Sequence, residues 1–397
     1  MPCDASLAAG RRIYLDNAAT SWPKPPAVYD AVDAYQRENG TAAGRGVYQR
    51  SQQVGRTLAL ARRRVAGLLG ASDPARVLFT FNGTDSLNAV LHGVPRPGDH
   101  VVTSDAEHNS VLRPLRMLEQ RANVSVTRVP CDSAGRIEPD DVARAVRPET
   151  RLLALTHASN VTGAIQPVDA FAAIAREHGV LLLIDAAQTA GHVPIFTDRW
   201  GVDFVAASGH KGLLGPLGTG ILVVGAAAAG QLAPFRQGGT GTFSESDEQP
   251  TTLPERFESG NHNVPGLVGL ERGAAFLEQR GWTELRRHEI ELTTRLVDGL
   301  RPLPGVTLFG PPDADRRVGV VSFRLERIDP QELASLLDSE YAIEVRSGLH
   351  CAPRTHDRMG TTRRGGTVRA AVGPFNSESD VDALVRAVAE IGAISHV

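Results

Sequence analysis

The chain has 397 residues, 42% of them hydrophobic and 22% charged, which is enough to bury a large core and predicts two domains. A formal net charge of -3 argues against the basic surface that nucleic-acid binding needs. The start lacks a signal-peptide pattern and no run is long enough to span a bilayer, which predicts a cytoplasmic protein with no membrane partner. The cysteines, Cys3, Cys131 and Cys351, show no CxxC spacing and suggest neither a disulfide framework nor a zinc site.

Short aliphatic runs alternate with helical patterns from about residue 76 to 224, which is typical of a mostly parallel sheet covered by helices. The fold class is therefore α/β. Expected strands end at Thr80, Ser104, His157, Asp185 and Ser208. Open parallel sheets bind ligands at the carboxyl ends of their strands. Polar residues gather at those ends and place a candidate site at residues 82–84, 105–110, 157–160, 185–188 and 208–211.

Residues 229–266 are rich in Gly, Ser, Thr and Pro and predict a long loop, which within a compact domain tends to be functional. A helical stretch follows at about 267–301, then strands near 317–323 and helices near 330–339 and 378–392. We therefore expect a large domain over residues 16–265 and a smaller α+β domain over 266–397 that takes in residues 1–15.

The segment SGHKGLLGPLGTG, residues 208–220, places Lys211 in a Gly-rich loop just after a strand. An amine there can form a Schiff base, and burial or a neighbouring cation would lower its pKa, although most lysines are simply solvated. Asp185, at the end of the apolar run VLLLID, would suit a pyridinium nitrogen as partner, or it could cap a helix. Gln188 could then donate to a phenolic oxygen of the same cofactor.

A phosphate site is predicted where Asn82-Gly83-Thr84 opens a helix, because Gly83 permits close approach while Thr84 and the first helical amides can donate. Ser208 and His210 would add donors from the lysine loop. His108, in DAEHNS, could lie on the cofactor ring and act as an acid or base. A capping or surface histidine is the alternative.

The segment RSGLHCAPRTH, residues 346–356, places Cys351 on a loop. Arg346, His350 and Arg354 are expected to give it positive surroundings that favour a reactive thiolate, whereas a buried, inert cysteine is the alternative. A metal site on His350, Cys351 and His356 would lack a fourth nearby ligand, so no metal is expected.

Arg369 lies in GTVRAAVG, a strand-like stretch that is otherwise small and apolar. A buried arginine needs an anion, and a substrate carboxylate fits its two-pronged guanidinium. The chain has no Walker A sequence, no GxGxxG after its first strand and no HExxH, so nucleotide-binding and metalloprotease functions lack support.

Together these segments resemble the class V aminotransferase-fold enzymes that use pyridoxal 5'-phosphate (PLP), and best the branch of cysteine desulfurases and selenocysteine lyases. The motifs are YLDNAAT (14–20), NGTDSLN (82–88), EHNS (107–110), SNVTG (159–163), DAAQ (185–188), SGHK (208–211), RFESG (256–260) and RSGLHCAP (346–353). The resemblance implies the PLP-dependent transferase fold type I, with a mostly parallel seven-stranded sheet in the large domain. It also implies a homodimer with its active site at the subunit boundary.

The resemblance further implies roles for individual residues. Lys211 would carry the cofactor, Asp185 would face the pyridine nitrogen, and His108 would stack on the ring. Gln188 and Asn160 would contact the phenolic oxygen of the cofactor. Its phosphate would be bound by Gly83, Thr84, Ser208 and His210. The substrate would be bound by Ala19, Asn160 and Arg369. In the family, the loop that reaches the phosphate in the partner subunit usually carries Gly-Thr. This chain has Gly260-Asn261 there, so Asn261 would have to replace the threonine hydroxyl as the phosphate contact.

The resulting hypothesis is a cysteine desulfurase that converts L-cysteine to L-alanine and holds the sulfur on Cys351 as a persulfide for a thiol acceptor. Lys211 would remove the α-proton, and His108 would help to deprotonate the substrate thiol. L-selenocysteine should also be a substrate. The alternatives are a selenocysteine lyase, another class V enzyme such as an aminotransferase, epimerase or C–S lyase, or a non-catalytic interaction protein.

Overall fold

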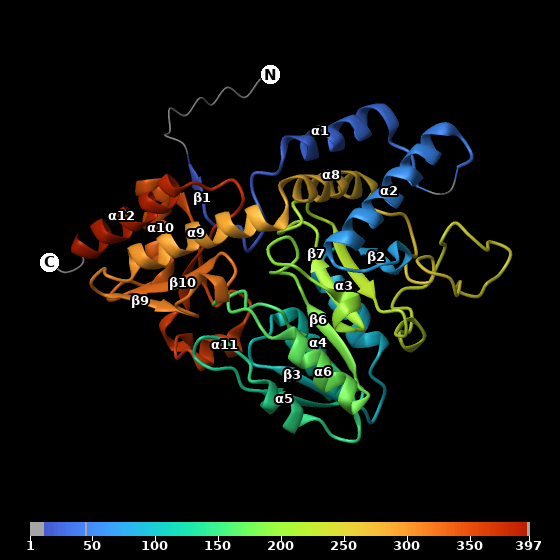
Figure 1. Ribbon diagram of the computed structural model, residues 1–397, viewed down its shortest axis with the longest axis horizontal. Coiled ribbons are helices and arrows are strands. Elements are labelled where there is room, and N and C mark those ends of the chain that lie inside the picture. Colours follow the sequence, from blue (N-terminus) through green and yellow to red (C-terminus); the bar gives the residue numbers. More distant parts are fainter. Residues whose placement is uncertain (1–11, 44–45, 395–397) are drawn as a thin grey trace.

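The computed structural model describes residues 12–43 and 46–394, and its centre is a seven-stranded sheet (Figure 1). The order of its strands is β2-β8-β7-β6-β5-β3-β4. All neighbours pair in parallel except β8, which is antiparallel to both β2 and β7, so the expected mostly parallel α/β sheet is confirmed. The strands are β2 (Val77–Thr80), β3 (His100–Ser104), β4 (Ser125–Val129), β5 (Thr150–Thr156), β6 (Leu181–Asp185), β7 (Phe204–Ser208) and β8 (Gly220–Val224).

Helices cover both faces of this sheet. Successive strand residues point to opposite faces, so Leu153 and Leu155 of β5 join one apolar core while Leu152 and Ala154 join the other. The first core contains residues of α2 (Gln49–Leu68), α6 (Val168–His178) and α8 (Val264–Arg280), and the second contains residues of α3 (Gly83–Gly93) and α4 (Asn109–Arg121). The other helices of this part are α1 (Pro26–Ala34), α5 (Pro139–Ala145) and α7 (Thr197–Trp200).

A second, antiparallel sheet has four strands in the order β12-β13-β10-β9. Its strands are β9 (Val306–Phe309), β10 (Val320–Leu325), β12 (Arg346–Gly348) and β13 (Thr367–Ala371). It shares a separate core with α9 (Trp282–Leu300), α10 (Pro330–Tyr341) and α12 (Glu378–Ile394), and α11 (Pro353–Arg358) follows the cysteine segment. β1 (Ile13–Tyr14) pairs in parallel with β11 (Ile343–Glu344), which brings the N-terminal segment to this smaller part.

The expected helical stretch at 267–301 consists of two helices, because α8 ends and α9 begins at Gly281. Gly281 has φ +76 and ψ 147, a backbone conformation that side-chain-bearing residues rarely adopt. α8 packs on α1 and α2 and joins the core of the large sheet, whereas α9 packs against α12. The first helix of the predicted small domain therefore packs with the large one, and the division at residue 266 stays a prediction.

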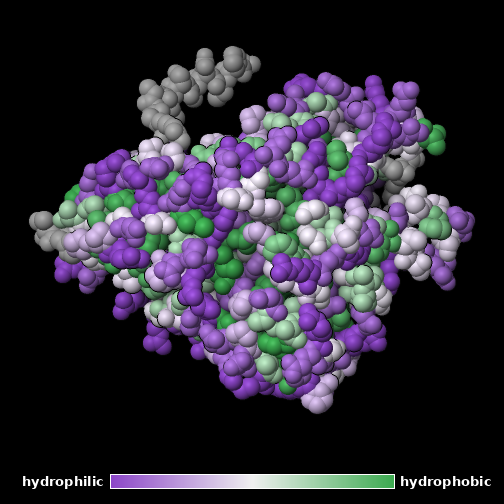
Figure 2. Space-filling view, viewed as in Figure 1, coloured by the Kyte–Doolittle hydropathy of each residue, from purple (hydrophilic) through white to green (hydrophobic). Residues whose placement is uncertain are grey.

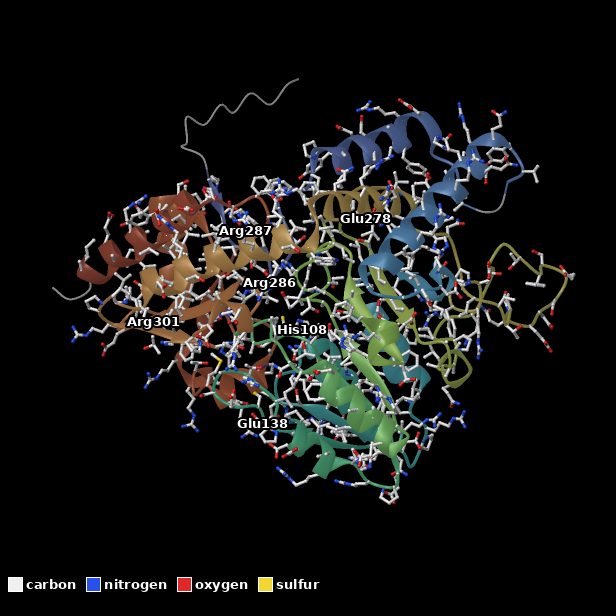
Figure 3. The ribbon with its side chains drawn as sticks, in the orientation of Figure 1. His108, Glu138, Glu278, Arg286, Arg287 and Arg301 are labelled. Carbon is white, nitrogen blue, oxygen red and sulfur yellow. The ribbon has the colours of Figure 1, made fainter. Side chains whose placement is uncertain are left out.

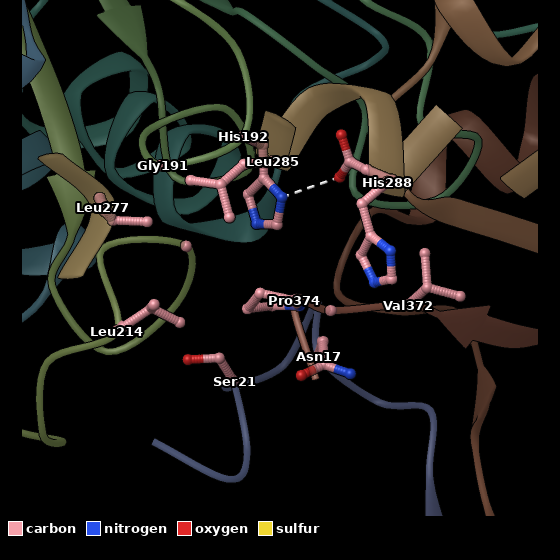
Figure 4. Close-up of a pocket in the computed structure, with 13 residues that line it drawn as sticks. Asn17, Ser21, Gly191, His192, Leu214, Leu277, Leu285, His288, Val372 and Pro374 are labelled. Atoms are coloured by element: carbon pink, nitrogen blue, oxygen red, sulfur yellow. Dashed lines mark hydrogen bonds and ion pairs between the residues drawn. The ribbon is translucent and has the colours of Figure 1, made fainter. Parts of the chain in front are cut away.

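The seam between the two parts contains a hollow of about 440 Å³. His192, in the turn after β6, and Glu289 of α9 face each other there across 2.8 Å between Nδ1 and Oε1 (Figure 4). Glu289 Oε1 also accepts a hydrogen bond from the Gly319 amide at 2.9 Å. These contacts connect the turn that follows Asp185 with α9 and with the residue that precedes β10 of the second sheet.

Hydrophilic residues dominate the visible surface, with apolar ones scattered among them (Figure 2). In residues 12–43 and 46–394, no helix is both long and apolar enough to cross a membrane. The expected long loop is confirmed, because no helix or strand intervenes between a short 3-10 turn at Ala229–Gln231 and α8.

Candidate active site

A pocket lies at the carboxyl ends of the central strands, where the sequence placed it. Its walls come from segments that follow β2, β3, β5, β6 and β7. The predicted site residues that it brings together are Gly83, Thr84, His108, Asn160, Asp185, Gln188, Ser208 and Lys211. Residues far apart in the sequence thus form one chemical site because their strands are neighbours in the sheet.

Lys211 and Asp185 form the charged centre of this pocket. Burial lowers the pKa of Lys211 to about 8, and Arg369 and Arg346 add to that shift against the opposing charge of Asp185. The expected lowering is therefore confirmed. Burial raises the pKa of Asp185, whose Oδ1 accepts a hydrogen bond from the Ala187 amide at 2.9 Å. Asp185 caps a turn rather than a helix, and the pair can hold a free amine beside a carboxylate.

His108 lines the pocket and its side chain caps α4, so the capping alternative is confirmed while its role on a cofactor ring stays a prediction. It is partly buried and is labelled in Figure 3. Its Nδ1 accepts a hydrogen bond from the Ser110 amide at 3.0 Å, which leaves the proton of the neutral ring on Nε2. Burial, followed by the charge of Lys211, lowers its pKa to about 4. At neutral pH His108 is therefore uncharged and offers a hydrogen-bond donor.

Hydroxyl groups gather at the N-terminus of α3. The Asn82 side chain caps this helix by accepting from the Asp85 amide at 2.9 Å, and Gly83 is its first residue. A Cβ at Gly83 would lie 2.5 Å from Ser208 Oγ, so only glycine leaves room there. Thr84 Oγ1 lies 2.7 Å from Ser110 Oγ. Hydroxyls beside the first amides of a helix suit a phosphate.

The surroundings of Cys351 differ from the prediction. Arg346 Nη2 lies 3.6 Å from Cys351 Sγ, as expected of a neighbouring cation. His350, however, is buried, and this burial lowers its pKa to about 2, so the prediction that it contributes positive charge is wrong. Arg354 Nη1 donates to Asp105 Oδ1 at 3.2 Å, which balances its charge. Among these predicted neighbours, only Arg346 faces the sulfur.

Arg369 is 1% exposed and lies outside the pocket wall. Its Nη2 pairs with Asp16 Oδ1 at 2.7 Å, and its Nη1 donates to the Asn160 carbonyl at 3.1 Å. Its Nε has no hydrogen-bond partner among the described residues. The anion that the sequence required is therefore present in the chain itself as Asp16, which sequence reasoning missed although it lies within the YLDNAAT motif.

Four other predicted residues lie outside the pocket wall, and Cys351 is one of them. The His210 ring is buried with no partner for Nδ1 among the described residues, and burial lowers its pKa to about 4. Ala19 follows Ala18, whose carbonyl accepts from Gln188 Nε2 at 3.0 Å, so it is next to the wall. Asn261 lines a separate hollow with Glu258. Cys3 lies outside the described residues.

Comparison with known proteins agrees with this arrangement. A "Probable cysteine desulfurase" of Methanothermobacter thermautotrophicus is 35% identical, over 96% of this chain and 95% of its own. A "Cysteine desulfurase" of Klebsiella pneumoniae is 32% identical, over 96% of this chain and 93% of its own. An apo structure of the cysteine desulfurase of Thermococcus onnurineus matches with a TM-score of 0.90 at 33% identity. The match covers 96% of this chain and 95% of that chain.

The cysteine desulfurase CsdA (S-sulfonic acid) of Escherichia coli has a TM-score of 0.87 at 29% identity, over 96% of this chain and 95% of that chain. Such agreement over nearly full length extends to both sheets. The sequence itself matches the aminotransferase class-V family over residues 13–384. The chain is therefore a member of the aminotransferase class-V family.

Proposed function

We propose that this chain is a PLP-dependent cysteine desulfurase that releases L-alanine from L-cysteine and receives the sulfur on Cys351. The observation that carries the proposal is the position of the cysteine. Its carbonyl accepts a hydrogen bond from the Asn109 amide at 2.7 Å, directly after the pocket residue His108. A half-exposed thiol beside the Arg346 guanidinium therefore lies next to a pocket that contains a lysine of lowered pKa.

The pocket residues fit PLP. Lys211 would hold it, Asp185 would face its pyridine nitrogen, and Gly83, Thr84 and Ser208 would bind its phosphate beside the first amides of α3. When bound, PLP supplies an electron sink for charge released at the substrate's α-carbon.

Two side-chain amides, those of Gln188 and Asn160, could donate hydrogen bonds to the phenolic oxygen of PLP. Gln188 uses one Nε2 proton on the Ala18 carbonyl and Asn160 uses one Nδ2 proton on the His350 carbonyl, so each retains a second proton. Further roles fall to residues that lie outside the pocket wall. We propose that His210 reaches the phosphate and that Asn261 reaches the phosphate of the partner subunit.

The residues divide the chemistry between them. Lys211, with its pKa of about 8, moves the proton of the α-carbon. The Cys351 thiolate attacks the substrate sulfur, so the S–S bond forms as the C–S bond breaks, and the alanine carbon takes a proton. At neutral pH the His108 ring is uncharged with its proton on Nε2, so on the sulfur side it donates a hydrogen bond and not a proton. Arg369, through the Nε that has no partner among the described residues, and the backbone at Ala19 would hold the substrate carboxylate. A thiol acceptor then attacks the outer sulfur.

We further propose a homodimer that acts in the cytoplasm, where a catalytic thiol stays reduced. Large apolar side chains that a second copy would cover include Val47 (93% exposed), Leu217 (67%) and Phe243 (53%). Light scattering would give twice the chain mass. A monomer at micromolar concentration would contradict this part of the proposal.

The function is tested by measuring alanine from L-cysteine with PLP and a thiol reductant but no keto acid. We expect alanine from the wild-type protein and none from Lys211→Ala. Alanine that appears only after a keto acid is added would instead make the chain an aminotransferase. L-selenocysteine is the second substrate to assay. Turnover of selenocysteine without any turnover of cysteine would make the chain a selenocysteine lyase.

A further inference from the structure

We propose that Asn160 positions Cys351, so that one side chain serves both the cofactor pocket and the loop that carries the sulfur acceptor. The inference rests on the proposed function and adds a role outside the pocket to this residue. Asn160 lines the pocket and lies four residues after the end of β5 (Thr156), on the large sheet. Cys351 belongs to the smaller part of the molecule, just after β12. The contact between them therefore crosses the seam.

The geometry of this contact is tight and buried. Asn160 Nδ2 donates to the His350 carbonyl at 2.6 Å, and the two residues are 8% and 2% exposed. The Asn160 carbonyl in turn accepts from Arg369 Nη1 at 3.1 Å. Water cannot easily replace these partners, because each lies in the interior, where an unpaired carbonyl costs about 1–3 kcal/mol.

The cysteine loop needs such a restraint. His350 has φ 47 and Cys351 has φ 60, so two consecutive residues with side chains adopt the left-handed backbone. Each such residue costs roughly 1–2 kcal/mol and persists only where surrounding contacts enforce it. Here the backbone carbonyls of both strained residues accept hydrogen bonds from residues that follow strands of the large sheet. Asn160 holds that of His350, and the Asn109 amide holds that of Cys351 at 2.7 Å.

A coupling follows from this arrangement. The Asn160 amide has two protons, one bound to the loop and one free to face the pocket. A group that binds the second proton fixes the orientation of the amide and thereby strengthens its hold on the loop. Occupation of the pocket should therefore restrain Cys351, and loss of the amide donor should release it.

Hydrogen exchange tests this coupling without any turnover. Asn160→Asp keeps the shape but replaces the donor by an oxygen facing the His350 carbonyl, and Asn160→Ala removes the donor without adding charge. We expect backbone amides of residues 349–352 to exchange at least about tenfold faster in both apo variants, which corresponds to a loss of about 1.4 kcal/mol. Added PLP should slow this exchange in the wild-type protein and not in the variants.

Asn39→Asp is the matched control, because this asparagine contacts Arg50 and Thr41 and lies far in the chain from the loop. It should exchange as the wild type does. Unchanged exchange at residues 349–352 in both Asn160 variants would overturn the proposal. So would slower alanine formation with unchanged exchange, because Asn160 would then act on the cofactor alone. If the wild type formed no alanine, the proposed function would fail while the exchange data still decided the role of Asn160.

Discussion

Glu107 is a buried acid beside the pocket, and replacing it by glutamine should stabilise the protein. Its Oε1 accepts from Ser104 Oγ at 2.6 Å and from the Thr156 amide at 3.1 Å, whereas Oε2 has no hydrogen-bond partner among the described residues. Burial raises its pKa from 4.5 to about 8, and the charge of Asp185 adds to this. Glutamine keeps the shape and the accepting oxygen.

The magnitude follows from the raised pKa. The folded chain keeps Glu107 protonated while the unfolded chain ionises it above pH 4.5. Its contribution to stability is therefore intact below pH 4.5 and declines until pH reaches about 8. At about 1.4 kcal/mol per pH unit, the loss is about 3 kcal/mol at pH 7 and about 5 kcal/mol above pH 8. Glu107→Gln removes this loss.

The assay is urea unfolding of the apo-protein at fixed concentration, at several values from about pH 5 to about pH 8. We expect the free energy of unfolding of Glu107→Gln to exceed that of the wild type by an amount that grows with pH. Glu119→Gln is the control of opposite sign. Arg128 lowers the pKa of Glu119, so removing the Glu119 carboxylate should not raise the free energy of unfolding. A pH-independent difference between Glu107→Gln and the wild type would refute the reasoning.

Two further predictions concern the pocket. Gly83→Ala should weaken PLP binding at least about tenfold, because its Cβ would lie 2.5 Å from Ser208 Oγ, whereas Gly67→Ala in α2, with nothing within 4 Å, should leave it unchanged. Equal PLP titrations of the two variants would contradict the phosphate cradle. The rate at which apo-protein captures PLP should rise about tenfold per pH unit up to about pH 8 and then level off, because the free amine of Lys211 has a pKa of about 8. A flat profile from about pH 6 to about pH 9 would contradict this pKa.

The position of the pocket was predictable from the sequence because it depends on local signals. The apolar runs predicted to end at His157, Asp185 and Ser208 belong to β5, β6 and β7, which are neighbouring parallel strands. Parallel strands bring their ends together whatever the loops do. β4 and β8 were not among the individually predicted strands. β4 is a partly exposed edge strand, SVTRV, and β8 follows a Gly-rich loop, so neither has clear signals at both ends.

Contacts between the two parts could not be predicted, because they depend on tertiary packing. Arg369 was expected to need an anion, but nothing local identifies Asp16 as that anion. The hydrogen bond from Asn160 to His350 joins residues that are 190 positions apart. The neutral state of His350 likewise depends on its burial and on the charge of Arg369, which are facts of packing and not of the motif.

The most direct test of the central claim is alanine release from L-cysteine, with PLP and a thiol reductant, by the wild type, Cys351→Ala and Cys131→Ala. Cys131 is the matched control, because it is a buried free cysteine whose pKa is raised by burial to about 12. We predict activity in the wild type and in Cys131→Ala, a persulfide on Cys351 by mass spectrometry, and almost no alanine from Cys351→Ala. Equal alanine from all three proteins would contradict the assignment of Cys351 as the sulfur acceptor.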